Sequence, residues 1–211
     1  MITKIEEIPV TEESYPFASA ERYLKLSEYG YTEKEYYMYG TANVYETVDE
    51  RGTVGVRTAD VPYVNRIIVR APEDVKTCSG NVVVEIINPT SFMEIDRMWI
   101  LGWKKFVRDG DIYVGITSKP NTIAKLIEFD SKRYGRLSWP NPTLDVPFPD
   151  YLQATGGTGD LNHNYETGLF WDMLTDLAWL LRKEEEMNPI RAYRRDAICL
   201  TGWSQSGSYL F

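Results

Sequence analysis

The sequence predicts an α/β protein in which helices flank a mostly parallel β-sheet. Three apolar runs have the length and composition of buried strands, at residues 81–88, 111–117 and 197–201. Segments with helical spacing of apolar residues separate these runs, at 92–106 and 169–181. This alternation favours parallel strands, because each helix returns the chain to the same end of the sheet. We therefore expect the three strands to be parallel neighbours in one sheet.

The N-terminal third carries shorter signals. Residues 19–39 begin with a helical pattern, and residues 36–48 alternate in the manner of a strand. A turn is indicated at 49–52, and the apolar run 66–69 predicts a further strand, ended by an Ala-Pro pair.

A long polar section rich in glycine and proline, at about 119–167, interrupts the alternation. It is too long for a plain connection, and Trp139, Phe148 and Tyr151 lie in it among several prolines, so we expect a lid-like insertion or pocket wall. Its glycine run 156–159 lacks the preceding strand and following Lys-Ser or Lys-Thr of a phosphate loop. A flexible loop fits this run better.

Composition narrows the class of protein. A chain of 211 residues suits one domain, and its net charge of -8 argues against nucleic acid as a partner. No apolar stretch reaches the length of a membrane span or a signal core, so we expect no membrane association and a cytoplasmic setting. Cys78 lies in a predicted loop and Cys199 in a predicted buried strand, so no disulfide is expected. No cofactor motif and no cluster of metal ligands is found in the sequence.

The most informative motif follows the last predicted strand. Residues 202–206, GWSQS, fit the nucleophile-elbow pattern G-x-S-x-G with Ser206 in place of the second glycine. A serine on a sharp turn from strand to helix needs small residues two positions away on each side, because the backbones crowd there; Gly202 and Ser206 meet that need. Ser204 is the predicted nucleophile. Ser206 is the alternative, but the strand runs directly into Gly202 and leaves no slack for two more residues.

A serine nucleophile needs a base to take its proton and an acid to orient that base. In the elbow-containing fold both follow the serine along the chain. No acid and no histidine follows Ser204, and the only histidine, His163, lies in a loop well before the elbow. We interpret His163 as a loop residue without a catalytic role, and expect the chain by itself to be inactive.

Two backbone amides are candidates for an oxyanion hole. The N–H of Gln205 follows the nucleophile at the start of the next helix. The second donor should come from the loop after residues 81–88, where Pro89 has no N–H and Thr90 is the best candidate. A simple Asn-Pro turn explains this loop equally well. Glu85, an acid within an apolar strand, is expected to be structural and held by an arginine or backbone donors.

The chain also resembles a known family. Strings spread along it match a group of α/β-hydrolase domain proteins with a G-x-S-Q-S-G elbow, in the expected order. They include Gly30-Tyr31, Gly40-Thr41-Ala42, Arg66 to Arg70, Gly80 to Glu85 with Asn88, Arg133-Tyr134-Gly135, and Gly202 to Gly207. The resemblance implies an α/β-hydrolase fold, of which residues 1–211 would be the N-terminal part of a single domain cut after the elbow. It also implies a nucleophile at Ser204.

Two functions compete at this point. The first is a serine hydrolase that cleaves a small-molecule ester or related acyl bond through an acyl-enzyme at Ser204. The second is a non-catalytic binding or structural protein on the same fold, in which Ser204 is only a turn residue.

Overall fold

The computed structural model describes residues 1–145 and 164–210. The strands are β1 (Ile2–Ile8), β2 (Tyr31–Thr47), β3 (Val54–Pro72), β4 (Asn81–Ile86), β5 (Ile112–Ile116) and β6 (Ala197–Gly202). The α-helices are α1 (Ala20–Leu24), α2 (Arg97–Asp109), α3 (Ile123–Phe129), α4 (Ser131–Tyr134) and α6 (Phe170–Arg182). Short 3-10 helices are η1 (Leu26–Tyr29), η2 (Val75–Thr77), η3 (Thr90–Phe92), η4 (Pro120–Thr122), η6 (Thr167–Leu169) and η7 (Ser204–Leu210).

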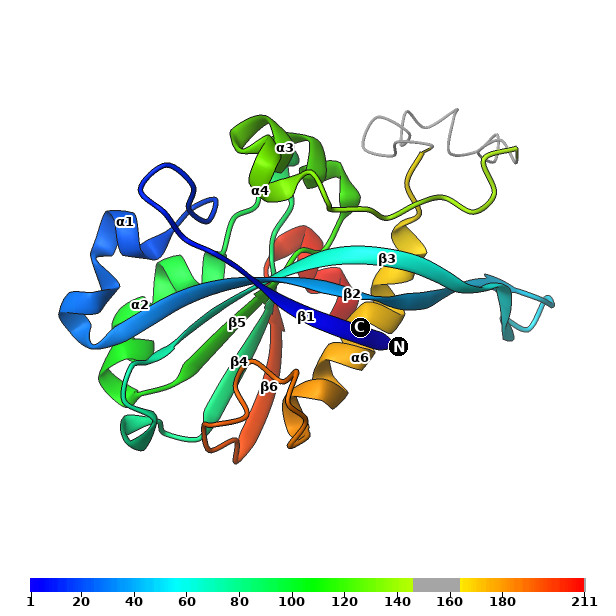
Figure 1. Ribbon diagram of the computed structural model, residues 1–211. Coiled ribbons are helices and arrows are strands. Elements are labelled where there is room, and N and C mark those ends of the chain that lie inside the picture. Colours follow the sequence, from blue (N-terminus) through cyan, green and yellow to red (C-terminus); the bar gives the residue numbers. More distant parts are fainter. Residues whose placement is uncertain (146–163, 211) are drawn as a thin grey trace.

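The strands form one six-stranded sheet in the order β1-β2-β3-β5-β4-β6, which fans across Figure 1. β4 pairs in parallel with β5 on one side and with β6 on the other, so the prediction of three parallel neighbours is confirmed. The sheet as a whole is mixed rather than mostly parallel, because β1, β2, β3 and β5 pair antiparallel in succession. A short turn joins β2 to β3, and such a turn can only produce an antiparallel pair.

Two cores cover the two faces of the sheet, because successive residues of a strand point to opposite sides. Val114 of β5 packs in the same core as Met173 and Leu177 of α6. Its neighbour Tyr113 faces the other way and contacts Trp99 of α2, with ring centroids 5.4 Å apart. Helices α2 and α6 therefore cover opposite faces. Within the segment 169–181, whose apolar spacing predicted a helix, the core-facing residues are Leu169, Met173, Leu177 and Leu180, and all four are buried.

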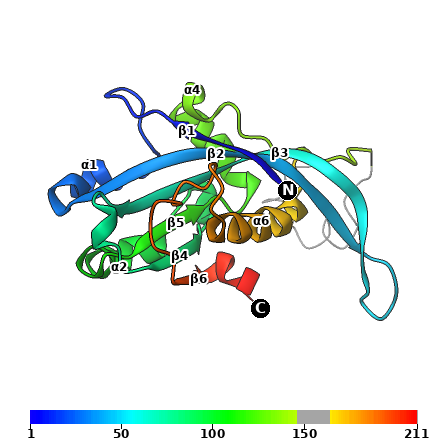
Figure 2. The ribbon, with the colours of Figure 1, turned by 60° about the horizontal axis from the view of Figure 1, so that its bottom comes forward.

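The pair β2–β3 is much longer than the sequence predicted. Its register runs from Tyr31 opposite Pro72 to Thr47 opposite Val54, and its far end projects from the body in both ribbon views (Figures 1 and 2). The far end of β2 lies within the predicted strand 36–48, whereas β3 before residue 66 was not predicted, because its projecting part is solvent-exposed on much of both faces and lacks apolar alternation. The turn predicted at 49–52 joins the two strands there.

Other elements differ from the prediction at particular residues. α2 begins at Arg97 and not near Phe92, because Phe92 belongs to a separate turn with a left-handed backbone. The section 119–167 contains α3 and α4, which were not predicted; Phe148, Tyr151 and the glycine run 156–159 lie outside the described residues. No helix among the described residues is long and apolar enough to span a membrane.

β6 is an edge strand, and this corrects the expectation that its side chains are buried. It has one hydrogen-bonded neighbour, β4, in the described sheet. Cys199 is exposed and Leu200 is 44% exposed, and no further strand of the described residues lies beside them. Cys78 and Cys199 are both free.

Candidate functional site

The turn from β6 into η7 places Ser204 at its apex. Ser204 has a φ of 53°, the left-handed region that non-glycine residues rarely adopt. Its side chain is exposed, as are the neighbouring Trp203 and Gln205. A strained backbone that presents an exposed serine hydroxyl is the arrangement that the nucleophile-elbow motif predicts.

Close backbone packing explains the small residues of the elbow. A Cβ atom on Gly202 would lie 2.7 Å from the carbonyl oxygen of Ser206 and 3.0 Å from the nitrogen of Gly207. A Cβ atom on Gly207 would lie 3.3 Å from the carbonyl oxygen of Gly202. The chain therefore folds back on itself around Ser204 with no room for a side chain at Gly202.

Ser206, the alternative nucleophile, is fully buried. Its Oγ accepts a hydrogen bond from the N–H of Trp203 at 3.1 Å and lies 3.0 Å from the carbonyl oxygen of Trp203, to which it donates. These contacts use the Ser206 hydroxyl to close the turn. Of the two serines, only Ser204 presents its hydroxyl to solvent.

The loop between β4 and α2 approaches the elbow through Asn88. The Asn88 Nδ2 donates to the carbonyl oxygen of Trp203 at 2.7 Å, and its Oδ1 accepts from the N–H of Thr90 at 3.1 Å. The main chain of Asn88 also exchanges hydrogen bonds with Ile95, which closes the loop at its base. In this structure the predicted oxyanion donor, the N–H of Thr90, is therefore held by Asn88 in an Asn turn.

The tip of this loop is strained. Ser91 and Phe92 have φ values of 58° and 61°, both in the left-handed region. Phe92 and Met93 are 41% and 44% exposed, so they give the loop an apolar surface. Backbone strain at consecutive residues persists only where the surroundings fix it.

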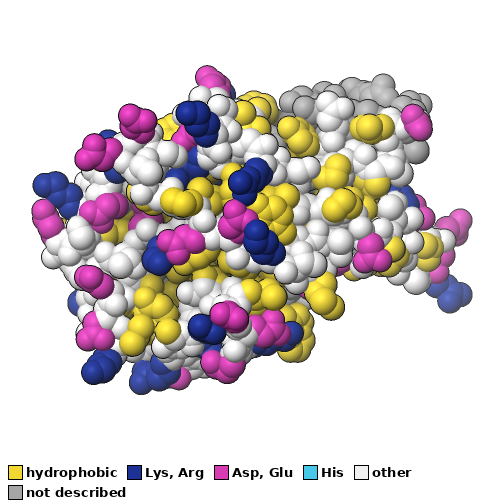
Figure 3. Space-filling view, in the orientation of Figure 1, with side chains coloured by type: hydrophobic (Ala, Val, Ile, Leu, Met, Phe, Trp, Pro, Cys, Tyr) yellow, Lys and Arg dark blue, Asp and Glu magenta, His cyan; other side chains and the backbone are white. Residues whose placement is uncertain are grey.

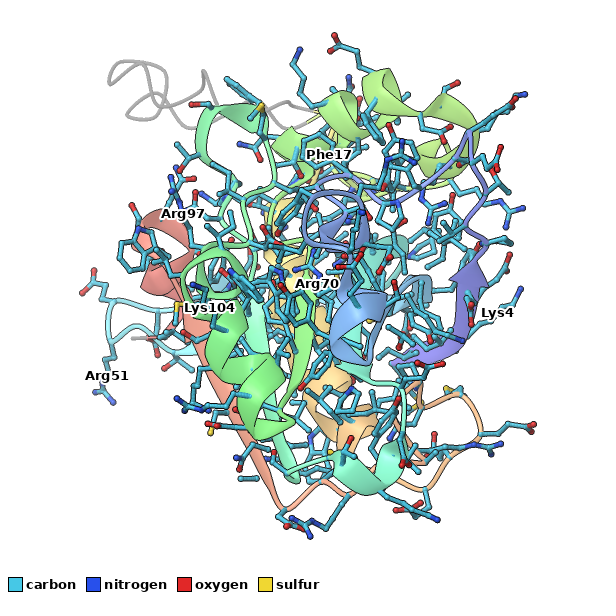
Figure 4. All side chains as sticks on the ribbon, turned by 90° about the vertical axis from the view of Figure 1, so that its left-hand side faces the viewer. Lys4, Phe17, Arg51, Arg70, Arg97 and Lys104 are labelled. Atoms are coloured by element: carbon cyan, nitrogen blue, oxygen red, sulfur yellow. The ribbon has the colours of Figure 1, made fainter. Side chains whose placement is uncertain are left out.

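Buried ion pairs supply that fixation on the far side of the loop. Glu94 pairs with Arg66 of β3, and Asp96 pairs with Arg70 of the same strand. Both arginines are almost completely buried. Figure 4 shows Arg70 in the interior, whereas Lys4 and Arg51 extend from the surface. The loop that carries Thr90 is thus joined to the sheet by two charged contacts that solvent does not screen.

Strand β2 contributes the opposing carboxylates. Glu35 contacts both Arg66 and Arg133 of α4, and Glu33 lies 2.7 Å from the Nε of Arg70. Burial alone would lower the pKa of Arg66, but Glu35 and Glu94 raise it well above its ordinary value. Burial raises the pKa of Glu94. The arginines therefore stay charged inside the protein.

Glu85 of β4 is also buried, and backbone donors hold it as expected. Its carboxylate accepts from the N–H of Met98 at 3.0 Å and from the Tyr113 hydroxyl at 2.8 Å. Burial raises the pKa of Glu85 to about 7, although these hydrogen bonds oppose the shift. Because Met98 lies in the first turn of α2, Glu85 fixes the start of that helix.

The sequence predicted part of this arrangement. It placed Gly202, Ser204, Gln205 and Ser206 together in the turn after the last strand, and their catalytic roles stay predictions; it did not predict the contacts of Asn88 or the buried ion pairs. Asn88 carried a signal in its Asn-Pro sequence, which is typical of a turn but does not show where the free amide points. The ion pairs had a clearer signal, since Arg66 and Arg70 share one face of an otherwise apolar strand.

His163 lies outside the described residues. Among residues 1–145 and 164–210, no group of three or more His, Cys, Asp or Glu side chains is arranged to hold a metal ion. The charged side chains of both signs are interspersed over the face shown in Figure 3.

Comparison with known proteins identifies the family. No curated protein sequence matches the chain. A solved structure, a CE15 glucuronoyl esterase from Teredinibacter turnerae, aligns with a TM-score of 0.35 and 11% identity; the alignment covers 98% of this chain and 40% of that one. The chain thus spans less than half the length of that esterase. A family model described as alpha/beta hydrolase domain matches residues 5–211. With nearly all of its length matched, the chain belongs to the alpha/beta hydrolase domain family.

Proposed function

We propose that the protein is a serine hydrolase that cleaves a small-molecule ester or related acyl bond. The observation that carries the proposal is the elbow: Ser204 is exposed, has a left-handed backbone and stands above tightly packed small residues. Membership of the alpha/beta hydrolase domain family supports hydrolysis as the type of reaction.

In this proposal the Oγ of Ser204 attacks the acyl carbon while its proton passes to a base. The carbonyl π-electrons move to the oxygen, and the N–H groups of Gln205 and Thr90 stabilise the resulting oxyanion. As the intermediate collapses, the base returns the proton to the leaving oxygen, so that the neutral alcohol departs and an acyl group stays on Ser204; water, activated by the same base, then removes this acyl group. In this proposal the N–H of Thr90 keeps its bond to the Asn88 Oδ1 and shares its hydrogen with the substrate oxygen in a three-centre hydrogen bond.

The described residues contain no histidine that could act as this base, and we interpret His163, which lies outside them, as a loop residue without a catalytic role. Without a base, oxyanion and binding contacts retain only a small part of the rate of an intact triad. We therefore propose that a polypeptide of these 211 residues alone hydrolyses esters too slowly to detect.

A fluorophosphonate probe tests the nucleophile directly. The protein, in the form that its own cell makes, is incubated with the probe, and the labelled residue is found by peptide mass spectrometry. We expect label on Ser204, and its loss in Ser204→Ala. Ser208→Ala is a matched control, because the Ser208 hydroxyl is exposed and donates to the carbonyl oxygen of Gln205 in the same turn.

Label on Ser204 in the wild type and in Ser208→Ala supports the proposal. An unlabelled Ser204, in a protein whose fold is intact by circular dichroism, contradicts it and favours a binding protein on the same fold.

A further inference from the structure

Among the described residues, the side chain of Asn88 connects the β4–α2 loop to the main chain of the elbow through a hydrogen bond. Asn88 is only 1% exposed. Its two amide atoms point to two parts of the candidate site. The Oδ1 holds the N–H of Thr90, and the Nδ2 holds the carbonyl oxygen of Trp203, the residue before Ser204.

We infer that Asn88 is a positioning residue, which sets the distance between the nucleophile and the second oxyanion donor. This inference rests on the proposed function of Ser204. The two parts come from different elements, since the loop follows β4 and the elbow follows β6. β4 and β6 are hydrogen-bonded only as far as Ile86 and Gly202, so beyond that point the sheet no longer fixes their separation. Asn88 lies two residues beyond Ile86, and its amide continues the connection between the loop and the elbow.

The distance between these two parts of the site affects the rate of the reaction. An oxyanion hole works only when its donors lie within hydrogen-bond distance of the oxygen in the transition state, and a displacement of about 1 Å can cost about a hundredfold in rate. Trp203 is half-exposed and Thr90 is exposed, so packing alone does not hold them together. A buried amide that bonds to both provides a rigid link.

The chain contains a close match to this turn at a different place. Asn188-Pro189 repeats the dipeptide Asn88-Pro89, and the Asn188 Oδ1 accepts from the N–H of Ile190 at 3.0 Å, two residues on. The Nδ2 of Asn188 donates to the carbonyl oxygens of Leu181 and Lys183 at the end of α6. Asn188 is 2% exposed and lies before β6 in the chain, whereas the elbow lies after β6. The same substitution at the two positions thus removes equivalent buried contacts, only one of which touches the elbow.

The test uses the protein as it is produced in its native cell. Each asparagine is replaced in turn by aspartate, which has nearly the same shape. Asn88→Asp keeps an oxygen acceptor for Thr90 but places a second oxygen against the carbonyl of Trp203. We expect the rate of fluorophosphonate labelling at Ser204, and kcat for a p-nitrophenyl ester, to fall by about tenfold to a hundredfold with KM within about twofold. Asn188→Asp should change these rates by less than about twofold. It should lower the melting temperature by about as much as Asn88→Asp does.

Amide hydrogen exchange of residues 203–206 provides a readout that does not require catalysis. We expect faster exchange there in Asn88→Asp, and no change in Asn188→Asp. Asn88→Ser is used if Asn88→Asp does not fold, since serine offers a shorter acceptor for Thr90 and cannot reach Trp203.

The outcomes separate the two proposals. If the wild type is labelled at Ser204 but Asn88→Asp is labelled at the wild-type rate, the positioning role is wrong and the proposed function stands. If the wild type is not labelled, the proposed function is wrong, and unchanged exchange at 203–206 would then also overturn the link that Asn88 provides.

Discussion

At the scale of single residues, Glu85 shows how burial turns a common acid into a group that titrates near neutrality. Its pKa of about 7 lies above its ordinary value of 4.5, because burial disfavours the charged form. Between these two pH values the folded protein holds a proton on Glu85 that the unfolded chain has released. The free energy of unfolding that depends on Glu85 is therefore largest below pH 4.5 and decreases as the pH rises towards 7.

Glu85→Gln should remove this dependence. We expect the variant to gain stability relative to the wild type as the pH rises from 5 to 8, by up to about 3 kcal/mol. The glutamine Oε1 still accepts from the N–H of Met98, so little should change below pH 5. Urea denaturation across this pH range measures the difference between the two proteins. Two curves that stay parallel from pH 5 to 8 would show that Glu85 does not titrate in this range.

At the scale of elements, buried ion pairs connect strands, helices and loops that hydrophobic packing alone would leave adjustable. Glu35 of β2 contacts Arg66 of β3 and Arg133 of α4 in a region from which solvent is almost excluded. Each charge was costly to bury, and each is tolerated only while its partners remain. The segment before α1 joins the same network, since the main-chain carbonyls of Phe17 and Ala18 accept from the two arginines of β3.

Glu35→Gln should destabilise the protein by about 3–5 kcal/mol, because it leaves two buried guanidinium groups short of one carboxylate. Glu7→Gln is the matched control. Glu7 of the adjacent strand β1 pairs with Lys34 at 3.0 Å, and both side chains are 50% exposed, so its loss should cost less than about 1 kcal/mol. Urea denaturation at pH 7 compares the two. Equal losses would mean that the buried pairs contribute no more than surface ones.

The same network marks the limit of what the sequence predicted at this scale. The apolar runs at 81–88 and 111–117 and the helical spacing at 169–181 correspond to β4, β5 and α6, because burial demands those patterns. The far end of β3 has no such pattern, since both of its faces meet solvent, whereas the far end of β2 lies within the predicted strand 36–48. The start of α2 was placed too early because Phe92 continues the apolar spacing of the helix although it belongs to a strained turn.

At the scale of the whole molecule, the sheet has β1 at one edge and β6 at the other. In the described sheet β6 also carries an exposed apolar side chain, Leu200, at 44% exposure. An exposed, apolar edge strand offers unpaired backbone groups to other chains. The elbow was predictable because its spacing is local, whereas the exposure of β6 depends on its position in the sheet, which the apolar run 197–201 does not specify.

We expect a polypeptide of residues 1–211 by itself to associate through β6. Leu200→Lys should reduce this association, because charges on edge strands oppose pairing. Val56→Lys is the control, since Val56 is 53% exposed on the projecting part of β3. Light scattering with size-exclusion chromatography measures the mass of each variant. Equal association of both variants and the wild type would place the contact elsewhere.

The two Asn-Pro turns have a consequence for the chemical ageing of the protein. Asparagine in proteins loses its amide when the next backbone nitrogen attacks the side chain to form a cyclic imide. The nitrogens of Pro89 and Pro189 carry no hydrogen and cannot complete that reaction. The pyrrolidine rings therefore protect Asn88 and Asn188 from the spontaneous change to aspartate, which at Asn88 would replace a donor to the elbow by a negative charge.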